Sequence, residues 1–161
     1  MFSYTQLRKD YPEFIYHGYQ IKEEKERICL EYDFEIPGLS SFHPTWEFPK
    51  RDEENRKYAD DSTFRKLAFS LGMVELISYW KIACPPKVIV EAGALTAEQI
   101  LWWKDLYFNG LGEFYYTNGI SENQEDFMEI VSAGQEISAD ALSDRRLEGC
   151  LVPVGGGKDS A

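Results

Sequence analysis

The stretch EFIYHGYQIKEEKERICLEYDFEI, residues 13–36, decides the fold class of the first part of the chain. Apolar and polar residues alternate strictly over residues 28–36, which is the period of a strand with one buried face and one wet face. A charged segment, residues 22–27, separates this run from a second apolar run at residues 14–21. The pattern predicts a β-hairpin.

The residues that follow the hairpin indicate the end of a β-rich region. Pro37 and Gly38 stop the second strand, and residues 42–49 are expected to add a short edge strand. The next stretch, KRDEENRKYADD at residues 50–61, is mostly charged and is interpreted as an exposed linker. We therefore expect a β-rich region over residues 13–49.

Helical periodicity begins after the linker. Asp61 or Ser62 can cap a helix that runs to about Lys81, before Pro85 and Pro86 end it. Its expected buried stripe follows three- and four-residue steps and consists of Phe64, Leu67, Ala68, Leu71, Val74, Ile77 and Trp80. Gly72 lies within this helix and is expected to weaken it slightly.

Further elements alternate between strand and helix. Residues 87–92 form a β-branched run that suits a buried strand. Thr96 with Gln99 predicts a capping box for a second helix, which ends near Asn109 and Gly110. Its expected apolar face consists of Ile100, Trp103, Leu106 and Tyr107. Residues 114–117 and 149–154 are predicted to be short strands.

These elements predict an α+β or α/β fold, with an antiparallel hairpin sheet followed by helices. We divide the chain into an N-terminal α+β region at residues 1–148 and the start of a second domain at residues 149–161. Within the first region, residues 62–118 form the helical layer and residues 119–148 are expected to be rich in loops. The sequence does not distinguish one domain from two within the first 148 residues.

Composition limits the classes of partner and compartment. The formal net charge is −11, which argues against a broad nucleic-acid surface. No stretch approaches the ~18 consecutive apolar residues of a membrane span, and the N-terminus lacks a signal peptide pattern. Three widely spaced cysteines, Cys29, Cys84 and Cys150, are typical of buried thiols in a reducing compartment. We expect a cytoplasmic protein.

A glycine loop near the end of the chain carries the clearest chemical signal. Gly155, Gly156 and Gly157 follow the expected strand at residues 149–154, so several main-chain N–H groups can point toward one phosphate. Lys158 supplies positive charge, and Ser160 can donate to a phosphate oxygen. Asp159 can hold Mg²⁺ directly or through water. These residues predict an ATP site.

Two common phosphate loops do not fit this segment. A Walker loop needs a glycine where Val152 stands, and a dinucleotide fingerprint needs a glycine where Ser160 stands. The segment resembles the PP-loop of ATP pyrophosphatases, Ser-Gly-Gly-x-Asp-Ser, with Gly155 in place of the first serine. That resemblance implies an adenine nucleotide alpha-hydrolase-like domain. Since the sequence stops at Ala161, we expect it to be a fragment that is inactive by itself.

A second resemblance covers residues 64–161. The runs Ser-Tyr-Trp-Lys at residues 78–81, Gln-x-x-Trp-Trp at residues 99–103 and Gly-x-Gly-Glu-Phe at residues 110–114 precede the glycine loop. In this order they resemble the UDP-N-acetylmuramoyl-L-alanyl-L-glutamate epimerase family (MurL). The resemblance implies an ATP- and Mg²⁺-dependent isomerase of peptidoglycan synthesis. Its substrate would be UDP-MurNAc-L-Ala-L-Glu, and the terminal L-Glu would become D-Glu with release of AMP and pyrophosphate.

The acid and base of such a reaction are not evident from the sequence. Glu113 and Lys81 are candidates for substrate contact or catalysis, against the simpler roles of a solvated carboxylate and a helix-end cation. Cys84 and Cys150 are candidate proton-transfer thiols, against the role of inert buried cysteines. Trp102 and Trp103 cannot both face the core, so one is free to stack on a uracil or sugar, or to pack on the sheet. His17 and His43 are assigned no role.

Two other functions use the same features. A PP-loop enzyme that modifies tRNA bases would carry the same glycine loop, although the acidic charge disfavours it. A non-catalytic domain for substrate binding or for contacts in a homo-oligomer would need no complete nucleotide site. The oligomeric state is not predicted.

Overall fold

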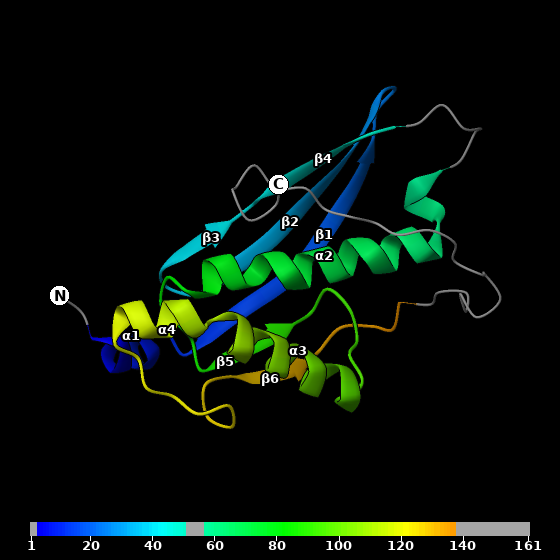
Figure 1. Cartoon of the computed structure of the whole chain (residues 1–161). Helices are drawn as coiled ribbons and strands as arrows, with labels where there is room; N and C mark the ends of the chain where they lie inside the picture. Colours follow the sequence, from blue (N-terminus) through cyan, green and yellow to red (C-terminus); the bar gives the residue numbers. More distant parts are fainter. Residues whose placement is uncertain (1–2, 51–56, 138–161) are drawn as a thin grey trace, which may run out of the picture.

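A six-stranded mixed sheet forms the backbone of the protein, and helices lie on one of its faces (Figure 1). The computed structural model describes residues 3–50 and 57–137. The strands are β1 (Glu13–Glu23), β2 (Arg27–Ile36), β3 (Ser40–Phe42), β4 (Thr45–Pro49), β5 (Lys87–Val90) and β6 (Glu129–Ser132). The helices are α1 (Tyr4–Asp10), the 3₁₀ turn η1 (Tyr58–Asp60), α2 (Ser62–Trp80), α3 (Ala97–Gly110) and α4 (Gly112–Asn118).

The predicted hairpin is confirmed. Strands β1 and β2 pair antiparallel, and the alternating apolar residues of β2 are buried from Ile28 to Ile36. Both β3 and β4 pair with the outer edge of β2, so the expected edge strand is present as two short pieces. Cys29 is buried as well, which confirms its expected role as a small core residue.

The other half of the sheet is parallel. Strand β5 pairs with β1, and β6 pairs with β5, so the order is β3-β2-β1-β5-β6. The hairpin thus supplies the first strand of a parallel three-stranded unit, which confirms the α+β class. The predicted strand at residues 149–154 lies outside the described residues.

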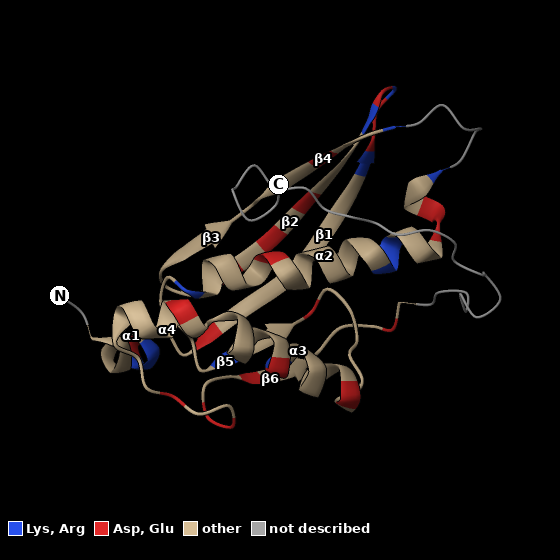
Figure 2. Ribbon diagram, in the orientation of Figure 1, with Lys and Arg blue, Asp and Glu red and all other residues tan. Residues whose placement is uncertain are grey.

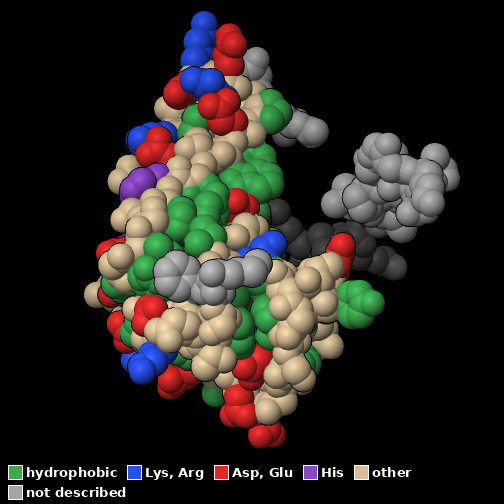
Figure 3. Space-filling model, turned by 90° about the vertical axis from the view of Figure 1, so that its left-hand side faces the viewer, with side chains coloured by type: hydrophobic (Ala, Val, Ile, Leu, Met, Phe, Trp, Pro, Cys, Tyr) green, Lys and Arg blue, Asp and Glu red, His purple; other side chains and the backbone are tan. Residues whose placement is uncertain are grey.

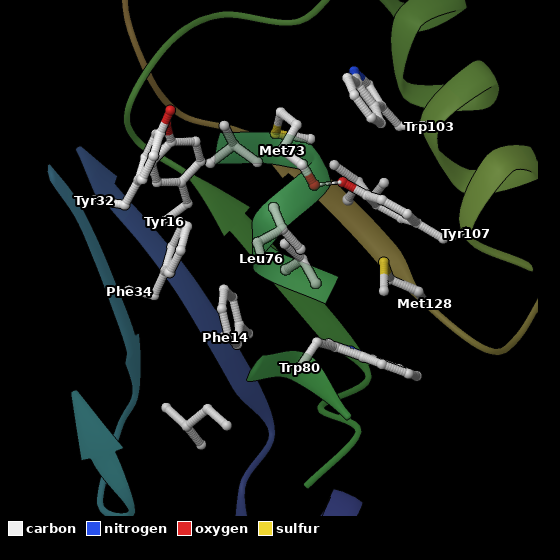
Figure 4. Close-up of a cluster of buried hydrophobic side chains, with 14 of the residues drawn as sticks. Phe14, Tyr16, Tyr32, Phe34, Met73, Leu76, Trp80, Trp103, Tyr107 and Met128 are labelled. Atoms are coloured by element: carbon white, nitrogen blue, oxygen red, sulfur yellow. Dashed lines mark hydrogen bonds between the residues drawn. The ribbon is translucent and has the colours of Figure 1, made fainter. Parts of the chain in front are cut away.

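Aromatic side chains fill the space between the sheet and α2 (Figure 4). Phe14 and Tyr16 from β1 and Phe34 from β2 are fully buried, and the ring centroids of Tyr16 and Phe34 lie 5.0 Å apart. Trp80 closes the end of α2, where its indole N–H donates a 2.8 Å hydrogen bond to the carbonyl of Pro85. Among the described residues no charged side chain is buried, so the core is apolar apart from its hydroxyl, indole and thiol groups.

Helix α2 confirms the predicted bounds but not the predicted face. Asp61 caps it by accepting a 2.8 Å hydrogen bond from the main-chain N–H of Phe64. Leu67 and Val74 are 61% and 51% exposed, so their expected burial is wrong. Ala68 and Trp80 of the expected stripe are buried. The other buried residues of the helix lie one position to either side of expected ones and are Phe69, Gly72, Met73 and Leu76. The apolar residues of α2 occur on all of its sides, so sequence periodicity alone does not select the face that meets the sheet.

Two short elements differ from the sequence prediction. Residues 114–117 belong to α4 and not to a strand, because Leu111 and Tyr115 are buried one helical turn apart and Gly119 ends the helix at φ 62°. Strand β6 was expected to be loop, since a four-residue strand gives little periodicity. Helix α3 starts at the predicted capping box, but Leu106 is 44% exposed.

Helix α1 lies at the amino-terminal edge of the parallel strands. The guanidinium of Arg8 donates to the carbonyl oxygens of Cys84 and Phe127, at 2.9 and 2.8 Å, and these residues precede β5 and β6. Arg8 therefore ties the starts of both strands together. The loops described below lie at the opposite edge, where the parallel strands β5 and β6 end.

Charged groups of both signs mix on the surface (Figure 2). The β1–β2 hairpin tip concentrates them in ion pairs such as Arg27 to Glu24 at 2.6 Å. Hydrophobic side chains reach the surface in a band below this tip (Figure 3). No helix among the described residues combines the length and apolar character needed to cross a membrane.

Candidate functional site

The carboxyl ends of β5 and β6 meet beside the middle of β1, where the pairing of β1 with β5 stops at Tyr16. The carbonyl oxygen of Tyr16 accepts hydrogen bonds from the N–H groups of Glu91 and Ala92, at 2.9 and 3.1 Å. The carbonyl of Val90 accepts in the same way from Ala133 and Gly134. The loops that follow β5 and β6 therefore start side by side, at the edge where open α/β sheets commonly bind ligands.

These two loops are held against each other. Ala94 N–H donates a 2.9 Å hydrogen bond to the Gln135 carbonyl, and Leu95 N–H donates 2.8 Å to the hydroxyl of Ser132. A Cβ at Gly134 would clash with the main chain at Gly93, at 2.5 Å from its nitrogen. Glycine is thus required for this close approach.

A groove of about 510 Å³ lies over this edge. Its polar lining comes from β1, from α2 and from the two loops, and consists of His17, Tyr19, Arg65, Glu91, Gln135 and Glu136. The hydroxyl of Tyr19 donates a 2.9 Å hydrogen bond to the Arg65 carbonyl, which joins β1 to α2.

The rim of the groove includes Ala59 of η1. A carboxylate oxygen of Glu23 accepts a 2.8 Å hydrogen bond from the Ala59 N–H, and the other accepts 3.1 Å from Lys50. The Ala59 N–H and the Lys50 ammonium lower the pKa of Glu23, against the opposing effect of its burial. Glu23 thus fixes η1 beside the groove.

His17 lies between two carboxylates in this groove. Its Nδ1 is 2.7 Å from Glu91 Oε2, and its Nε2 is 2.8 Å from Glu35 Oε2. Ionised carboxylates accept but do not donate hydrogen bonds, so both ring nitrogens carry protons in this arrangement. Partial burial acts to lower the pKa of His17, but the hydrogen bonds to Glu35 and Glu91 outweigh it and raise the pKa above 6.5.

A β-bulge places His17 in this position. Tyr16 pairs with Phe34 and Gly18 pairs with Asp33, so His17 is the extra residue of β1. Bulges redirect side chains and occur often beside functional sites. Sequence reasoning missed His17, although the apolar alternation changes phase between Tyr16 and Tyr19, which is a recognisable sign of a bulge.

A second groove of about 320 Å³ lies between α2 and α3. Lys66 and Ser70 contribute from α2, and Gln99 and Trp103 from α3. Glu136 and Ile137 line both grooves. The chain therefore runs past the two grooves before the glycine loop, which begins 18 positions after Ile137 in the sequence.

The structure places Glu113 and Lys81 away from these grooves. Glu113 is exposed in the first turn of α4. Lys81 is exposed at the C-cap of α2. Neither lines the two grooves, and their catalytic roles remain predictions.

The other candidates have distinct surroundings. Trp103 is 7% exposed and packs in the core, whereas Trp102 is 58% exposed, which confirms that one of the pair is free of the core. Cys84 is 4% exposed, and burial raises the pKa of its thiol to about 12, which suits an inert thiol better than a proton-transfer group.

The predicted ATP and Mg²⁺ residues, Gly155, Gly156, Gly157, Lys158, Asp159 and Ser160, lie outside the described residues, as does Cys150. Within residues 3–50 and 57–137, His, Cys, Asp and Glu side chains form no cluster that could hold a metal ion. The ATP site remains a prediction from sequence.

The mixed sheet, its one-sided helical layer and the groove at its carboxyl edge define an α+β domain. Comparison with known proteins gives its family. Residues 5–161 match the family described as the MurL N-terminal domain, and the chain belongs to that family.

One curated protein gives a more specific likeness. The chain is 33% identical over 90 residues to the UDP-N-acetyl-alpha-D-muramoyl-L-alanyl-L-glutamate epimerase of Xanthomonas oryzae pv. oryzae. The matched part spans 56% of this chain and 19% of that protein. No solved structure matches the chain.

Proposed function

We propose that this chain is part of an ATP-dependent epimerase that converts the terminal L-Glu of UDP-MurNAc-L-Ala-L-Glu to D-Glu in cytoplasmic peptidoglycan synthesis. The observation that carries the proposal is the family match over residues 5–161, together with the epimerase named in the similar protein. The sequence resemblance in residues 78–81, 99–103 and 110–114 supports it independently of the glycine loop.

The chemistry explains why ATP is needed. The Cα–H beside a carboxylate is a weak acid, because its deprotonation would add charge to an existing anion. Adenylation converts the carboxylate to a mixed anhydride, whose carbonyl can accept the electron pair. A base can then remove the proton, and an acid can return one on the opposite face. Hydrolysis of the mixed anhydride by water then releases AMP and restores the carboxylate.

The glycine loop is the proposed site of ATP. Gly156, Gly157 and Ser160 would contact phosphate oxygens, Lys158 would balance their charge, and Asp159 would hold Mg²⁺. The groove at the carboxyl edge is the proposed site for the amino-acid end of the substrate. Its support is the polar lining of the groove, which includes His17 and Arg65, at a sheet edge of the kind where open α/β folds commonly bind ligands.

The decisive experiment uses the full-length gene product. We expect incubation with ATP, Mg²⁺ and UDP-MurNAc-L-Ala-L-Glu to yield AMP and D-Glu in the dipeptide. UDP-MurNAc-L-Ala is the matched control, and we expect it to give no AMP because it lacks the glutamate carboxylate. AMP without D-Glu would keep the ATP pyrophosphatase but reject the epimerase, and no AMP would reject both.

A second experiment tests whether the 161-residue chain is active by itself. We expect it to form neither AMP nor D-Glu, since the part that matches the similar epimerase spans 19% of that protein. Turnover by this chain would show that residues 1–161 contain the whole catalytic site.

A further inference from the structure

Three side chains form a continuous hydrogen-bonded line from the groove across the sheet. Glu91 lines the groove, His17 follows at 2.7 Å, and Glu35 of β2 follows at 2.8 Å on the other side of the imidazole ring. The side chain of Glu91 is 47% exposed, so its carboxylate is accessible to a ligand in the groove. Glu35 lies on the neighbouring strand β2 and is not among the residues that line the groove.

Main-chain contacts of the sheet fix the position of each of these three residues. The bulge orients His17, and the Tyr16 carbonyl fixes Glu91 through the Glu91 N–H at 2.9 Å. Glu35 is fixed by the antiparallel pairing of β2 with Ile15 of β1. A short relay on strands and strand ends is better positioned than one on free loops.

An ion pair that only stabilised the fold would need one carboxylate beside the imidazole and not two. One imidazolium between two carboxylates has a net charge of −1, and the repulsion between the carboxylates opposes the gain from each pair. Exposed ion pairs of this kind typically contribute little to stability. Stability alone is therefore a poor reason for placing three titratable groups beside a groove.

We propose that Glu91 is a catalytic base of the epimerase, removing the Cα proton of the substrate glutamate, and that His17 and Glu35 are the residues that position it. This inference rests on the function proposed above. In the step, the Cα–H bond breaks, an O–H bond forms on Glu91, and the electron pair moves to the carbonyl of the adenylated carboxyl group. Inversion then requires a proton from a second Brønsted acid of the protein on the opposite face of Cα.

Other charged groups near the line would shape its pH dependence. Asp33 and Glu35 face His17 from β2, and Asp33 adds to the charge that favours the imidazolium. Arg65 of α2 and Glu136 after β6 line the same groove as Glu91. Glu91 thus faces a groove with groups of both signs.

The test measures proton exchange separately from ATP use. The full-length enzyme is incubated in D₂O with ATP, Mg²⁺ and UDP-MurNAc-L-Ala-L-Glu, and Cα deuterium, D-Glu and AMP are quantified. We expect Glu91→Gln to lower Cα exchange and D-Glu formation by about 10²-fold or more, the usual contribution of a general base, while AMP formation persists. Glu91→Asp should restore part of the exchange.

The neighbouring residues need readouts specific to positioning. We expect His17→Gln and Glu35→Gln to lower kcat for epimerisation and to shift its pH profile, with AMP formation retained. Glu31→Gln is the matched control, because Glu31 lies on β2 but pairs with Lys22 at 2.6 Å. It should leave rate and pH profile unchanged.

Each outcome separates the two proposals. A wild-type enzyme that forms AMP and D-Glu, with a Glu91→Gln variant that still exchanges Cα–H at the normal rate, overturns the role of Glu91 and leaves the epimerase standing. Loss of AMP formation in Glu91→Gln also overturns it, since Glu91 would then act in binding or folding. A wild-type enzyme without AMP overturns the proposed function itself.

Discussion

The hydroxyl of Tyr107 donates a 2.6 Å hydrogen bond to the main-chain carbonyl of Met73, so α3 is tied to α2 inside the core (Figure 4). Burial raises the pKa of Tyr107 well above 10, so this hydroxyl keeps its proton. The buried hydroxyl of Tyr16, in contrast, has no hydrogen-bond partner among the described residues. Of these two buried tyrosines, Tyr107 thus has a hydrogen-bond partner for its hydroxyl group and Tyr16 has none among the described residues.

This difference predicts opposite effects for one substitution. We expect Tyr107→Phe to lower the free energy of unfolding by about 1 kcal/mol, through loss of a buried hydrogen bond. Tyr16→Phe removes an unpaired hydroxyl and should leave stability unchanged or raise it by about 1 kcal/mol. Urea unfolding of the two variants measures both. Equal losses would show that the Tyr16 hydroxyl has a partner.

Gly72 predicts a steric limit at the contact between α2 and the sheet. A Cβ at this position would lie 2.6 Å from Tyr16 Cζ and 2.8 Å from Tyr32 Cε1. We expect Gly72→Ala to destabilise the protein by about 1–3 kcal/mol through overpacking, in spite of the better helix propensity of alanine. Thermal unfolding measures the change.

Gly110 provides the matched control for that substitution. It ends α3, and a Cβ there would meet nothing within 4 Å. Gly110→Ala should therefore be neutral or stabilise by up to about 1 kcal/mol. A Gly72→Ala variant as stable as Gly110→Ala would contradict the close approach of α2 to the two tyrosines.

The adjacent tryptophans of α3 predict a division between core and surface. Trp103→Ala should cost about 3–5 kcal/mol, as expected for a large buried aromatic residue. Trp102→Ala should change stability by about 0.5 kcal/mol or less, because the side chain is 58% exposed. Denaturant unfolding distinguishes them, and similar losses for the two variants would contradict the orientation of α3.

Local signals in the sequence were sufficient for most of the sheet and for both long helices. Strict alternation in residues 28–36 predicted β2, and the Thr96 and Gln99 capping box predicted the start of α3, because both depend on neighbouring residues alone. The face of α2 was not predictable, since Leu67 and Phe69 are both apolar and only the aromatic residues of the sheet select between them. The parallel pairing of β1 with β5 joins segments more than 70 positions apart and leaves no local signal.

The candidate site was less predictable than the fold. Sequence reasoning selected Glu113 and Lys81 by their place in resembling motifs, but a groove is created by tertiary contacts. His17 and Glu91 are 74 positions apart in the chain, and each is unremarkable in its own segment. A phase change in β1 was the single local sign that His17 occupies a special position.

The pair of carboxylates around His17 predicts a defined pH dependence of stability. The pKa of His17 is raised above its ordinary 6.5 in the folded protein. The stabilisation from the charged ring is therefore complete below about pH 6.5, and it is lost as the pH rises through the folded-state pKa. We expect the stability difference between the wild type and His17→Gln to shrink over that range, as measured by urea midpoints from about pH 5.5 to 9. A constant difference between the wild type and His17→Gln across the range would show that His17 does not change its charge between its two carboxylates.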